Sequence, residues 1–247
     1  MFGIHPVLEC LRESSREILE ILIAKEARGK ALKELEDEAR RRGVRVGFAG
    51  ASVLSRLVGG ERHQGVVARV PAPTYADFSV LLAERSADAG YSWILALDGI
   101  TDPQNFGALI RTAEGMGVRD LLVAKDRSVA LTPSVVKASA GAASHVRVYR
   151  VTNLRRALVS LKECGHWVVG LDAGAGEAIG QRDYPAKLVV VLGNEGTGIR
   201  PIIREECDFI VFIPMSGQIA SFNVGVSGAI FLYELLRQKQ KKMGTGC

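Results

Sequence analysis

The strongest constraint on the fold is a series of short apolar runs after Trp93, most of them separated by helical patterns. The runs read WILALD, DLLVA, HVRVYRV, HWVVGLD, KLVVVLG and DFIVFIP. Strands of a parallel sheet are buried on both faces, so they appear as continuous apolar runs between connecting helices. We therefore expect an α/β domain with a parallel sheet of about six strands over roughly 150 residues. Its last helix is predicted from about Asn223 to Gln240.

The first part of the chain reads as a smaller α/β unit. Strands are predicted at residues 17–24, 44–49 and 64–70, with a charged amphipathic helix at 30–43. The following segment carries Pro71 and Pro73 near its start and is typical of a linker with one short helix. The predicted organisation is a unit at 1–71, a linker at 72–91, a large domain at 92–240 and a polar tail at 241–247.

Charge and cysteine content limit the partners and the compartment. The formal net charge is +5, which favours a polyanionic partner without proving one. The four cysteines are scattered and form no metal-ligand pattern with the four histidines, so no metal is expected. No apolar run approaches the roughly 20 residues of a membrane span, and charge follows the N-terminus too closely for a signal peptide. We expect a cytoplasmic protein with no membrane association.

Polar residues and glycines follow three of the predicted strands. The first such segment is DPQNFGALIRTAEGMGV, where Asp102 or a neighbour can cap a helix that has Pro103 in its first turn. Asn105 lies in that turn. Arg111 lies off the apolar stripe and is either a functional group, a solvated charge or an ion-pair partner of Glu114.

The other two segments are NEGTGIRP and MSGQIASFNV. In the former, glycines flank Glu195 and let the backbone pass close to a ligand, although a simple turn is equally compatible. In the latter, Ser221 or Asn223 can cap the final helix or contribute to a binding site. A further glycine-rich segment, AGAGEAIG, resembles a Rossmann motif, but no amphipathic helix follows it and it comes after the fourth strand of the series.

Taken together, the three segments resemble the ordered motifs of the SpoU (TrmH-like) family of RNA ribose 2'-O-methyltransferases in the SPOUT superfamily. FGIHPVLECL and HQGVVARV are similar to the small substrate-binding domain of that family. VAKDRSVALTPSVVKASAGA and RVTNLRRAL resemble the subgroup that methylates a guanosine of 23S ribosomal RNA. The resemblance covers the whole chain.

The resemblance implies a methyltransferase domain with a C-terminal trefoil knot, an L30e-like N-terminal domain and a homodimer that uses S-adenosyl-methionine. The implied catalytic residues are Asn105, Arg111, Glu195, Ser221 and Asn223, and the implied cofactor-binding residues are Leu171, Gly193, Gly196, Ile213, Met215, Phe222 and Asn223. The third motif departs from the usual SLNVSVA at Phe222 and Gly225, which stand for Leu and Ser.

Two roles stay open at the sequence level. Arg111 could act as a base helped by an RNA phosphate, but an unperturbed guanidinium stays protonated, so a phosphate-binding role is favoured. Glu195 could bind the target nucleotide or brace its own loop through nearby backbone amides, and bracing is favoured.

RNA affinity is expected from the N-terminal unit, through Arg40, Arg41, Arg42, Arg62, His63 and Gln64, although basic runs are often only solvated. The favoured function is 2'-O-methylation of a guanosine in 23S ribosomal RNA. The alternatives are the same reaction on transfer RNA and a non-catalytic RNA-binding protein of the same fold. The presence of all five catalytic positions argues against a non-catalytic protein, and the N-terminal domain favours the ribosomal substrate.

Overall fold

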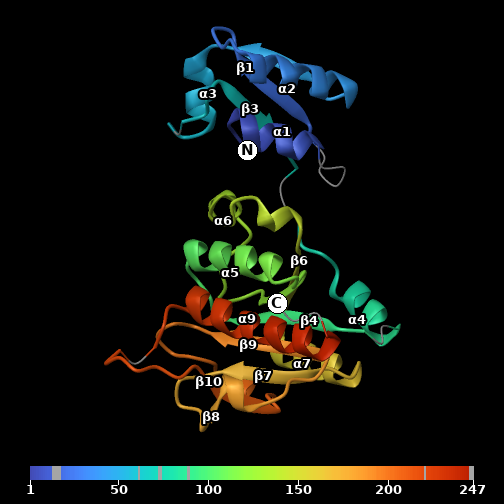
Figure 1. The fold of residues 1–247 in the computed structure, drawn as a ribbon, viewed down its shortest axis with the longest axis vertical. Helices are drawn as coiled ribbons and strands as arrows, with labels where there is room; N and C mark the ends of the chain where they lie inside the picture. The colour runs from blue at the N-terminus through green and yellow to red at the C-terminus, as the bar shows by residue number, and fades with distance from the viewer. Residues whose placement is uncertain (13–17, 61, 72–73, 88–89, 220, 245–247) are drawn as a thin grey trace. The chain divides into compact units, whose positions relative to one another are not determined.

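The chain folds into two compact units, Met1–Ala72 and Pro73–Cys247, in a computed structural model (Figure 1). The structure describes residues 1–12, 18–60, 62–71, 74–87, 90–219 and 221–244.

The N-terminal unit is a three-stranded sheet in the order β2-β1-β3, where β1 runs parallel to β2 and antiparallel to β3. Ile21 and Ile23 of β1 face a core that α1 and α2 cover, and Leu54 of α3 lies in a second, smaller cluster. The three predicted strands and the predicted helix are present, whereas α1 and α3 were not predicted. The elements are α1 (Ile4–Arg12), β1 (Glu20–Ala24), α2 (Lys30–Arg41), β2 (Val46–Ala49), α3 (Ala51–Leu57) and β3 (Val66–Arg69).

The second unit contains a seven-stranded sheet in the order β6-β5-β4-β9-β7-β10-β8. Every pairing in it is parallel, so the predicted class of sheet is confirmed. All six predicted strands are present, and the two-residue β8 is an addition. The strands are β4 (Ser92–Asp98), β5 (Asp120–Ala124), β6 (Arg147–Val151), β7 (Trp167–Leu171), β8 (Glu177–Ala178), β9 (Lys187–Gly193) and β10 (Phe209–Phe212).

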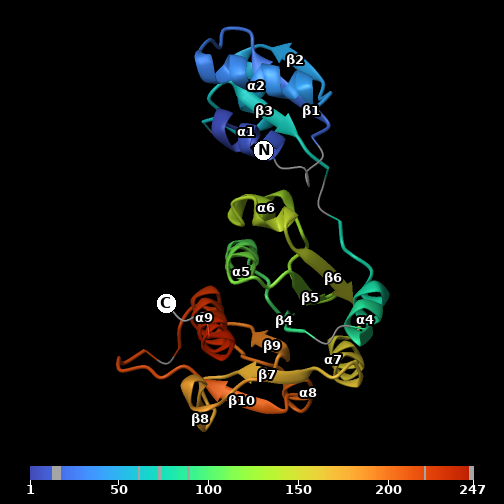
Figure 2. The ribbon, with the colours of Figure 1, turned by 45° about the vertical axis from the view of Figure 1, so that its right-hand side comes forward.

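Helices cover both faces of this sheet (Figure 2). One face packs against α5 (Pro103–Gly115), α6 (Pro133–Ala138), η1 (Ala142–Ser144) and α9 (Val224–Met243), with Phe106, Leu109 and Phe231 in the core. The other packs against α4 (Phe78–Ala87), α7 (Leu154–Glu163) and α8 (Pro201–Arg204), with Leu81, Leu158 and Ile203 in the core. Each fully buried Leu, Ile or Phe contributes about 1.5–3 kcal/mol, so these helices are held mainly by their apolar faces.

Two boundaries differ from the sequence-based prediction. The segment predicted as a linker contains the one helix expected there, α4, but Leu81 of this helix is fully buried in the core of the second unit. The predicted polar tail is helical at its start, because α9 continues to Met243, and residues 245–247 lie outside the described part. The expectation that no amphipathic helix follows AGAGEAIG is confirmed: β8 lies within this segment, the short η2 (Ile179–Gln181) overlaps its end, and β9 is the next element. Within the described residues, no helix is both long and apolar enough to cross a membrane.

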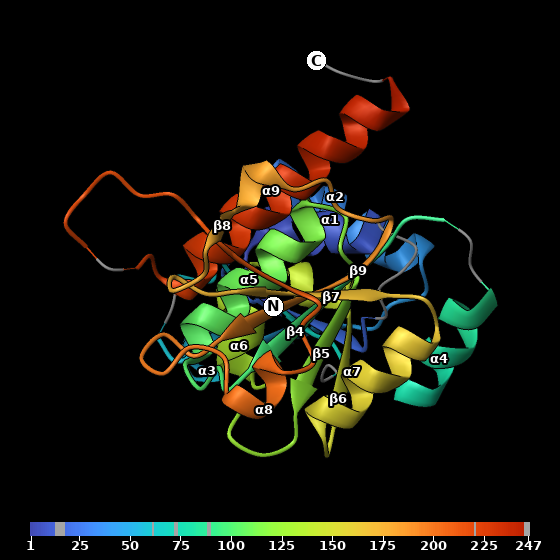
Figure 3. The ribbon, with the colours of Figure 1, turned by 90° about the horizontal axis from the view of Figure 1, so that it is seen from below.

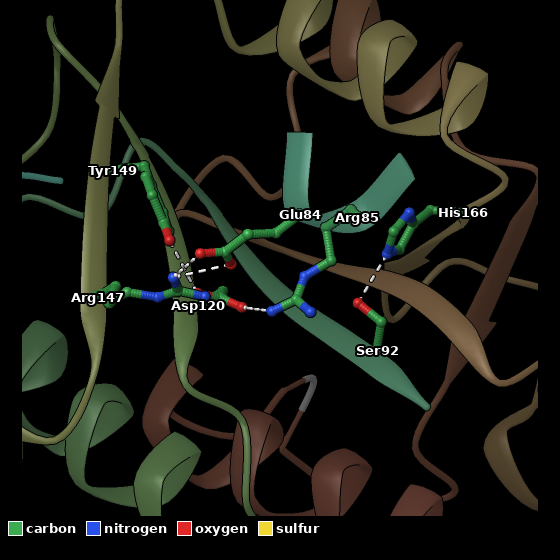
Figure 4. Close-up of polar contacts among 7 residues, drawn as sticks. All are labelled: Glu84, Arg85, Ser92, Asp120, Arg147, Tyr149 and His166. Carbon is green, nitrogen blue, oxygen red and sulfur yellow. Dashed lines mark hydrogen bonds and ion pairs between the residues drawn. The ribbon is translucent and has the colours of Figure 1, made fainter. Parts of the chain in front are cut away.

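A buried polar cluster ties α4 to the edge of the sheet where strands β4, β5 and β6 begin (Figure 4). Asp120 is 2% exposed and accepts hydrogen bonds from Arg147 Nε at 2.9 Å and from the Tyr149 hydroxyl at 3.0 Å. Arg85 of α4 forms an ion pair with the same carboxylate. Burial, with the nearby Asp120 charge, raises the pKa of Tyr149. These contacts join α4 to the starts of β5 and β6.

Candidate functional site

The opposite edge of the sheet, where the strands end, brings the three polar loops together. Asp98 at the end of β4 pairs with Gly193 at the end of β9. Leu171 at the end of β7 pairs with Leu192 on one side and with Val211 of β10 on the other. The chain leaves β4 toward β5 but leaves β9 toward β10, so the strand order reverses between β4 and β9. Open parallel sheets bind ligands at such a point.

Three side chains from the three loops form one hydrogen-bonded cluster at this edge. Asn105 Nδ2 donates to Glu195 Oε1 at 2.8 Å, and Asn223 Nδ2 donates to the same oxygen at 2.5 Å. Asn223 Nδ2 also lies 2.9 Å from Asn105 Oδ1, and the backbone amide of Val224 lies 3.4 Å from Glu195 Oε1. In the sequence, Asn105 and Asn223 lie 90 and 28 positions away from Glu195, so these bonds hold the three loops in one arrangement.

Helix caps place the two asparagines. Asp102 caps α5 by accepting from the backbone amides of Gln104 and Asn105, both at 3.2 Å, with Pro103 in the first turn as predicted. Asn223 caps α9 by accepting from the Gly225 amide at 2.9 Å. Of the two predicted caps, Asn223 is therefore the one that the structure uses. The Nδ2 of Asn223 donates within the cluster, while its Oδ1 accepts from a backbone amide at the start of the helix.

Gly225 leaves little space beside this cap. A Cβ atom there would lie 3.1 Å from Asn223 Oδ1 and 3.4 Å from the Ala108 Cβ on α5. Position 225, where glycine replaces the serine of the usual third motif, is thus a position where α9 approaches α5 closely.

The glycine-rich loop after β9 closes on itself. Asn194 N donates to Gly198 O at 3.1 Å, and Gly198 N donates to Asn194 O at 2.8 Å. Asn194 Oδ1 accepts from the amides of Gly196 and Thr197, at 2.9 and 3.4 Å. The prediction that Glu195 binds the amides of its own loop is therefore wrong, because Asn194 does so. Glu195 is left free to reach the other two loops.

Gly193 allows the chain to return across the end of its own strand. A Cβ atom at this position would lie 2.2 Å from the Gly198 carbonyl carbon and 2.3 Å from the Ile199 nitrogen. Real Cβ atoms do not approach backbone atoms so closely, so only glycine fits. The returning loop therefore covers the end of β9, next to the end of β7 at Leu171.

Two predicted catalytic residues lie outside the hydrogen-bonded cluster. Arg111 is exposed on α5, and among the described residues it has no hydrogen bond or ion pair, including with Glu114. Ser221 is exposed and has no hydrogen bond within the described part of the chain. It belongs to the segment between β10 and α9, which extends away from the sheet (Figures 1 and 3).

The apolar members of the predicted cofactor set lie around the same edge. Leu171 ends β7, and Ile213 follows β10 directly. Ile213, Met215 and Phe222 are each half-buried, while Gly196 is exposed. The structure thus places Leu171, Gly193 and Ile213 at adjacent strand ends, with Met215 and Phe222 on the extended segment.

Two residues that the sequence analysis missed support this edge. Asp98 is 1% exposed and accepts from the Arg200 backbone amide at 2.9 Å and from Arg200 Nε at 2.7 Å. The available signal was an aspartate directly after the apolar run WILAL, where a charged side chain needs a buried partner.

The predicted RNA-binding residues of the N-terminal unit fall into two groups at opposite ends of its sheet. Arg40, Arg41 and Arg42 lie at the end of α2, which precedes the start of β2. Arg62, His63 and Gln64 precede β3, which is antiparallel to β1, and Ala24 at the end of β1 donates to Gly65 O at 2.8 Å. A partner would therefore have to extend along the sheet to contact both groups.

Intramolecular bonds occupy several of these side chains. The two ring nitrogens of His63 contact Ser55 Oγ and the Gly65 amide, both at 3.0 Å. Gln64 Oε1 accepts from the Ile4 amide at 3.2 Å. Arg41 pairs with Glu38 at 2.5 Å, whereas Arg40 and Arg62 are simply exposed. Arg40 and Arg62 are the members most available to a partner.

The described residues contain no group of three or more His, Cys, Asp or Glu side chains arranged to hold a metal ion. The polar side chains at the strand ends are instead two amides and one carboxylate, which suit an organic ligand with several polar groups.

Fold and site together define an α/β protein with a candidate ligand site at the carboxyl edge of a parallel sheet, where Asn105, Glu195 and Asn223 join three loops. The model of the SpoU rRNA methylase family matches residues 92–233, and that of the RNA 2'-O ribose methyltransferase substrate-binding domain matches residues 1–76. The chain therefore belongs to the SpoU rRNA methylase family, as the motifs predicted.

Individual relatives extend over nearly the whole chain. A protein of Shewanella oneidensis named 23S rRNA (guanosine-2'-O-)-methyltransferase RlmB is 38% identical over 245 residues, with 97% of each chain covered. The putative TrmH family tRNA/rRNA methyltransferase YacO of Bacillus subtilis is 36% identical, with 97% of this chain and 95% of YacO covered. The crystal structure of the SpoU methyltransferase AviRb from Streptomyces viridochromogenes, in complex with AdoMet, has a similar fold: the TM-score is 0.77 at 24% identity, covering 98% of this chain and 90% of AviRb.

Proposed function

We propose that this protein transfers a methyl group from S-adenosyl-methionine to the ribose 2'-oxygen of a guanosine in 23S ribosomal RNA. The observation that carries the proposal is the Asn105–Glu195–Asn223 cluster, which unites the three family motifs at the switch point of the sheet. The names of the RlmB relatives support the choice of substrate.

The strand ends suit S-adenosyl-methionine. Gly193 carries no side chain where the loop crosses the strand, and half-buried Leu171 and Ile213 offer apolar contact on neighbouring strands. Gly196, Met215, Phe222 and Asn223 complete the proposed binding set. When bound, the cofactor supplies an activated methyl group on a sulfonium, so no metal is required. The AdoMet in the AviRb crystal structure supports this assignment.

The protein must then position the ribose and handle the hydroxyl proton. Positioning alone can lower a barrier by about 7–11 kcal/mol in favourable cases. Arg111 remains cationic, binds the phosphate beside the target ribose through its planar guanidinium, and stabilises the alkoxide as it develops. Its exposure and its lack of an ion pair among the described residues support this role. Glu195 braces the site, and Ser221 contacts ligand or RNA from the extended segment.

A homodimer is part of the proposal. Val226 and Tyr233 lie seven positions apart on α9 and are 46% and 59% exposed, and Ile219 on the preceding segment is 62% exposed. Residues seven apart share one face of a helix, so α9 presents an apolar stripe beside the site. A second copy of this chain would cover it and bring its own residues to the extended segment. The C-terminal trefoil knot stays a prediction from the family resemblance.

The N-terminal unit, as an L30e-like domain, supplies RNA affinity. Arg62 and Arg40 are its most available cations, and the formal net charge of +5 favours RNA binding overall. A ribosomal RNA substrate implies a cytoplasmic location.

Transfer RNA is the second candidate substrate, favoured by the YacO relative, whose name includes both RNA classes. A labelled-methyl assay on unmodified 23S RNA and on transfer RNA distinguishes the two. We expect label in 23S RNA and none in transfer RNA. Label in transfer RNA alone would support the second candidate, and label in neither RNA would remove the enzymatic function.

A further inference from the structure

We infer that the Asp98–Arg200 pair is a positioning element of the site: it sets the place of the loop that carries Glu195. This inference rests on the proposed methyltransferase activity. Asp98 ends β4, in register with Gly193 at the end of β9, so it lies at the switch point itself. Its side chain is fully buried, while that of Arg200 is 36% exposed.

Both carboxylate oxygens of Asp98 are used by one residue. Oδ2 accepts from the Arg200 backbone amide at 2.9 Å, and Oδ1 accepts from Nε at 2.7 Å with a terminal guanidinium nitrogen 2.6 Å away. The carboxylate of Asp98 is fully buried and both of its oxygens already accept from Arg200, so it is not accessible to a ligand although Asp98 lies beside the site. Its role is therefore to hold Arg200 rather than to bind substrate or cofactor.

Arg200 fixes the far end of the Glu195 loop. The loop leaves β9 at Asn194 and returns across Gly193, and Arg200 follows two residues after Gly198. A second bond fixes the near end, because Asn194 Nδ2 donates to Gly99 O at 2.9 Å. The loop is thus anchored at both ends to Asp98 and Gly99, two consecutive residues of one strand end.

The anchored loop places Glu195, and Glu195 in turn orients Asn105 and Asn223. A lysine at position 200 would keep the positive charge but lose the paired Nε and guanidinium contacts. We expect the loop to shift in such a variant. Misplacement of about 1 Å can lower a rate roughly 100-fold.

The chain contains a matched control at the other edge of the same sheet. Asp120 is also a buried aspartate at a strand terminus, and Arg147 donates to it through Nε at 2.9 Å with a terminal nitrogen at 2.8 Å (Figure 4). Arg147→Lys removes a similar guanidinium contact far along the strands from Glu195, while Asp120 keeps its ion pair with Arg85. The activity of Arg147→Lys therefore measures the effect of weakening a buried ion pair when the Glu195 loop does not move.

The test combines Arg200→Lys, Arg147→Lys, Glu195→Gln and the Arg200→Lys/Glu195→Gln double variant. We expect Arg200→Lys to lower the single-turnover rate of methyl transfer at least tenfold and Arg147→Lys to change it less than twofold. In the Glu195→Gln background, Arg200→Lys should cost less than about threefold, because the pair acts through Glu195. Amide hydrogen exchange of the cofactor-free protein should become faster at Gly196 and Gly198 only in the Arg200→Lys variants.

Equal losses in Arg200→Lys and Arg147→Lys would overturn the inference, since stability alone would then explain both. A full tenfold loss in the Glu195→Gln background, or unchanged exchange at Gly196 and Gly198, would also overturn it. Failure of the proposed function is a different result: the wild-type protein would then transfer no methyl group, while the exchange measurement would still report on the loop.

Discussion

Glu195 Oε1 lies 2.5 Å from Asn223 Nδ2, which places a carboxylate from the second loop against the residue that caps the final helix. The same oxygen accepts from Asn105 at the start of α5. One charged acceptor thus connects two helix starts with a glycine loop. Hydrogen bonds to an ionised acceptor are roughly twice as strong as neutral ones, so the connection depends on the charge of Glu195.

Replacing that charge should weaken cofactor binding and leave RNA binding intact. Glu195→Gln keeps the shape of the side chain but makes its hydrogen bonds neutral, a difference of about 1 kcal/mol or roughly fivefold in the dissociation constant. Calorimetry with S-adenosyl-methionine and filter binding with RNA measure the two affinities. If RNA affinity fell while cofactor affinity stayed the same, Glu195 would contact the nucleotide instead of bracing the site.

Arg111 should require its guanidinium. Arg111→Lys keeps the charge but loses bidentate phosphate binding, and loss of one donor to a developing negative charge costs about 100- to 1000-fold in rate. We expect single-turnover methyl transfer to fall at least tenfold with little change in cofactor affinity. Arg119→Lys is the matched control, because Arg119 is exposed and precedes β5 at the other edge of the sheet. Near-full activity of Arg111→Lys would exclude the bidentate role.

Gly193 should tolerate no side chain. Gly193→Ala forces a Cβ atom to within 2.2 Å of the Gly198 backbone, so the loop must move. Such overpacking costs about 1–3 kcal/mol, and cofactor affinity should fall with it. In Gly115→Ala the new Cβ meets no atom within 4 Å, and an alanine at this helical position should be neutral or stabilising. Thermal melts with and without cofactor compare the two, and equal melting temperatures would contradict the steric argument.

The apolar stripe on α9 should control the oligomeric state. Tyr233→Glu places a charge in the proposed interface and should shift a dimer toward monomer in light scattering coupled to gel filtration. Lys241→Glu changes the charge of an exposed residue on the last turns of the same helix and should leave the dimer intact. A wild-type monomer at working concentration would rule out the proposed dimer, and an intact dimer in Tyr233→Glu would place the interface elsewhere.

The strands and the polar loops could be predicted because each strand buried on both faces leaves a continuous apolar run. The contacts of Glu195 could not, because they depend on β9 lying between β4 and β7, an order that no local pattern reveals. The prediction that Glu195 binds the amides of its own loop was wrong, because Asn194 accepts from those amides and Glu195 accepts from Asn105 and Asn223. Similarly, Arg40 and Arg62 were grouped by charge, although they lie at opposite ends of the sheet. The antiparallel direction of β3 causes this separation, because it places Arg62 at the end of the sheet where β1 finishes.

The most direct test of the central claim is nucleoside mass spectrometry of unmodified 23S RNA after incubation with the protein and S-adenosyl-methionine. The account predicts one new nucleoside, 2'-O-methylguanosine, at a single position. It also predicts that Asn105→Ala and Arg111→Ala abolish or greatly reduce this product. A methyl group on a base, or no methylated nucleoside at all, would contradict the account.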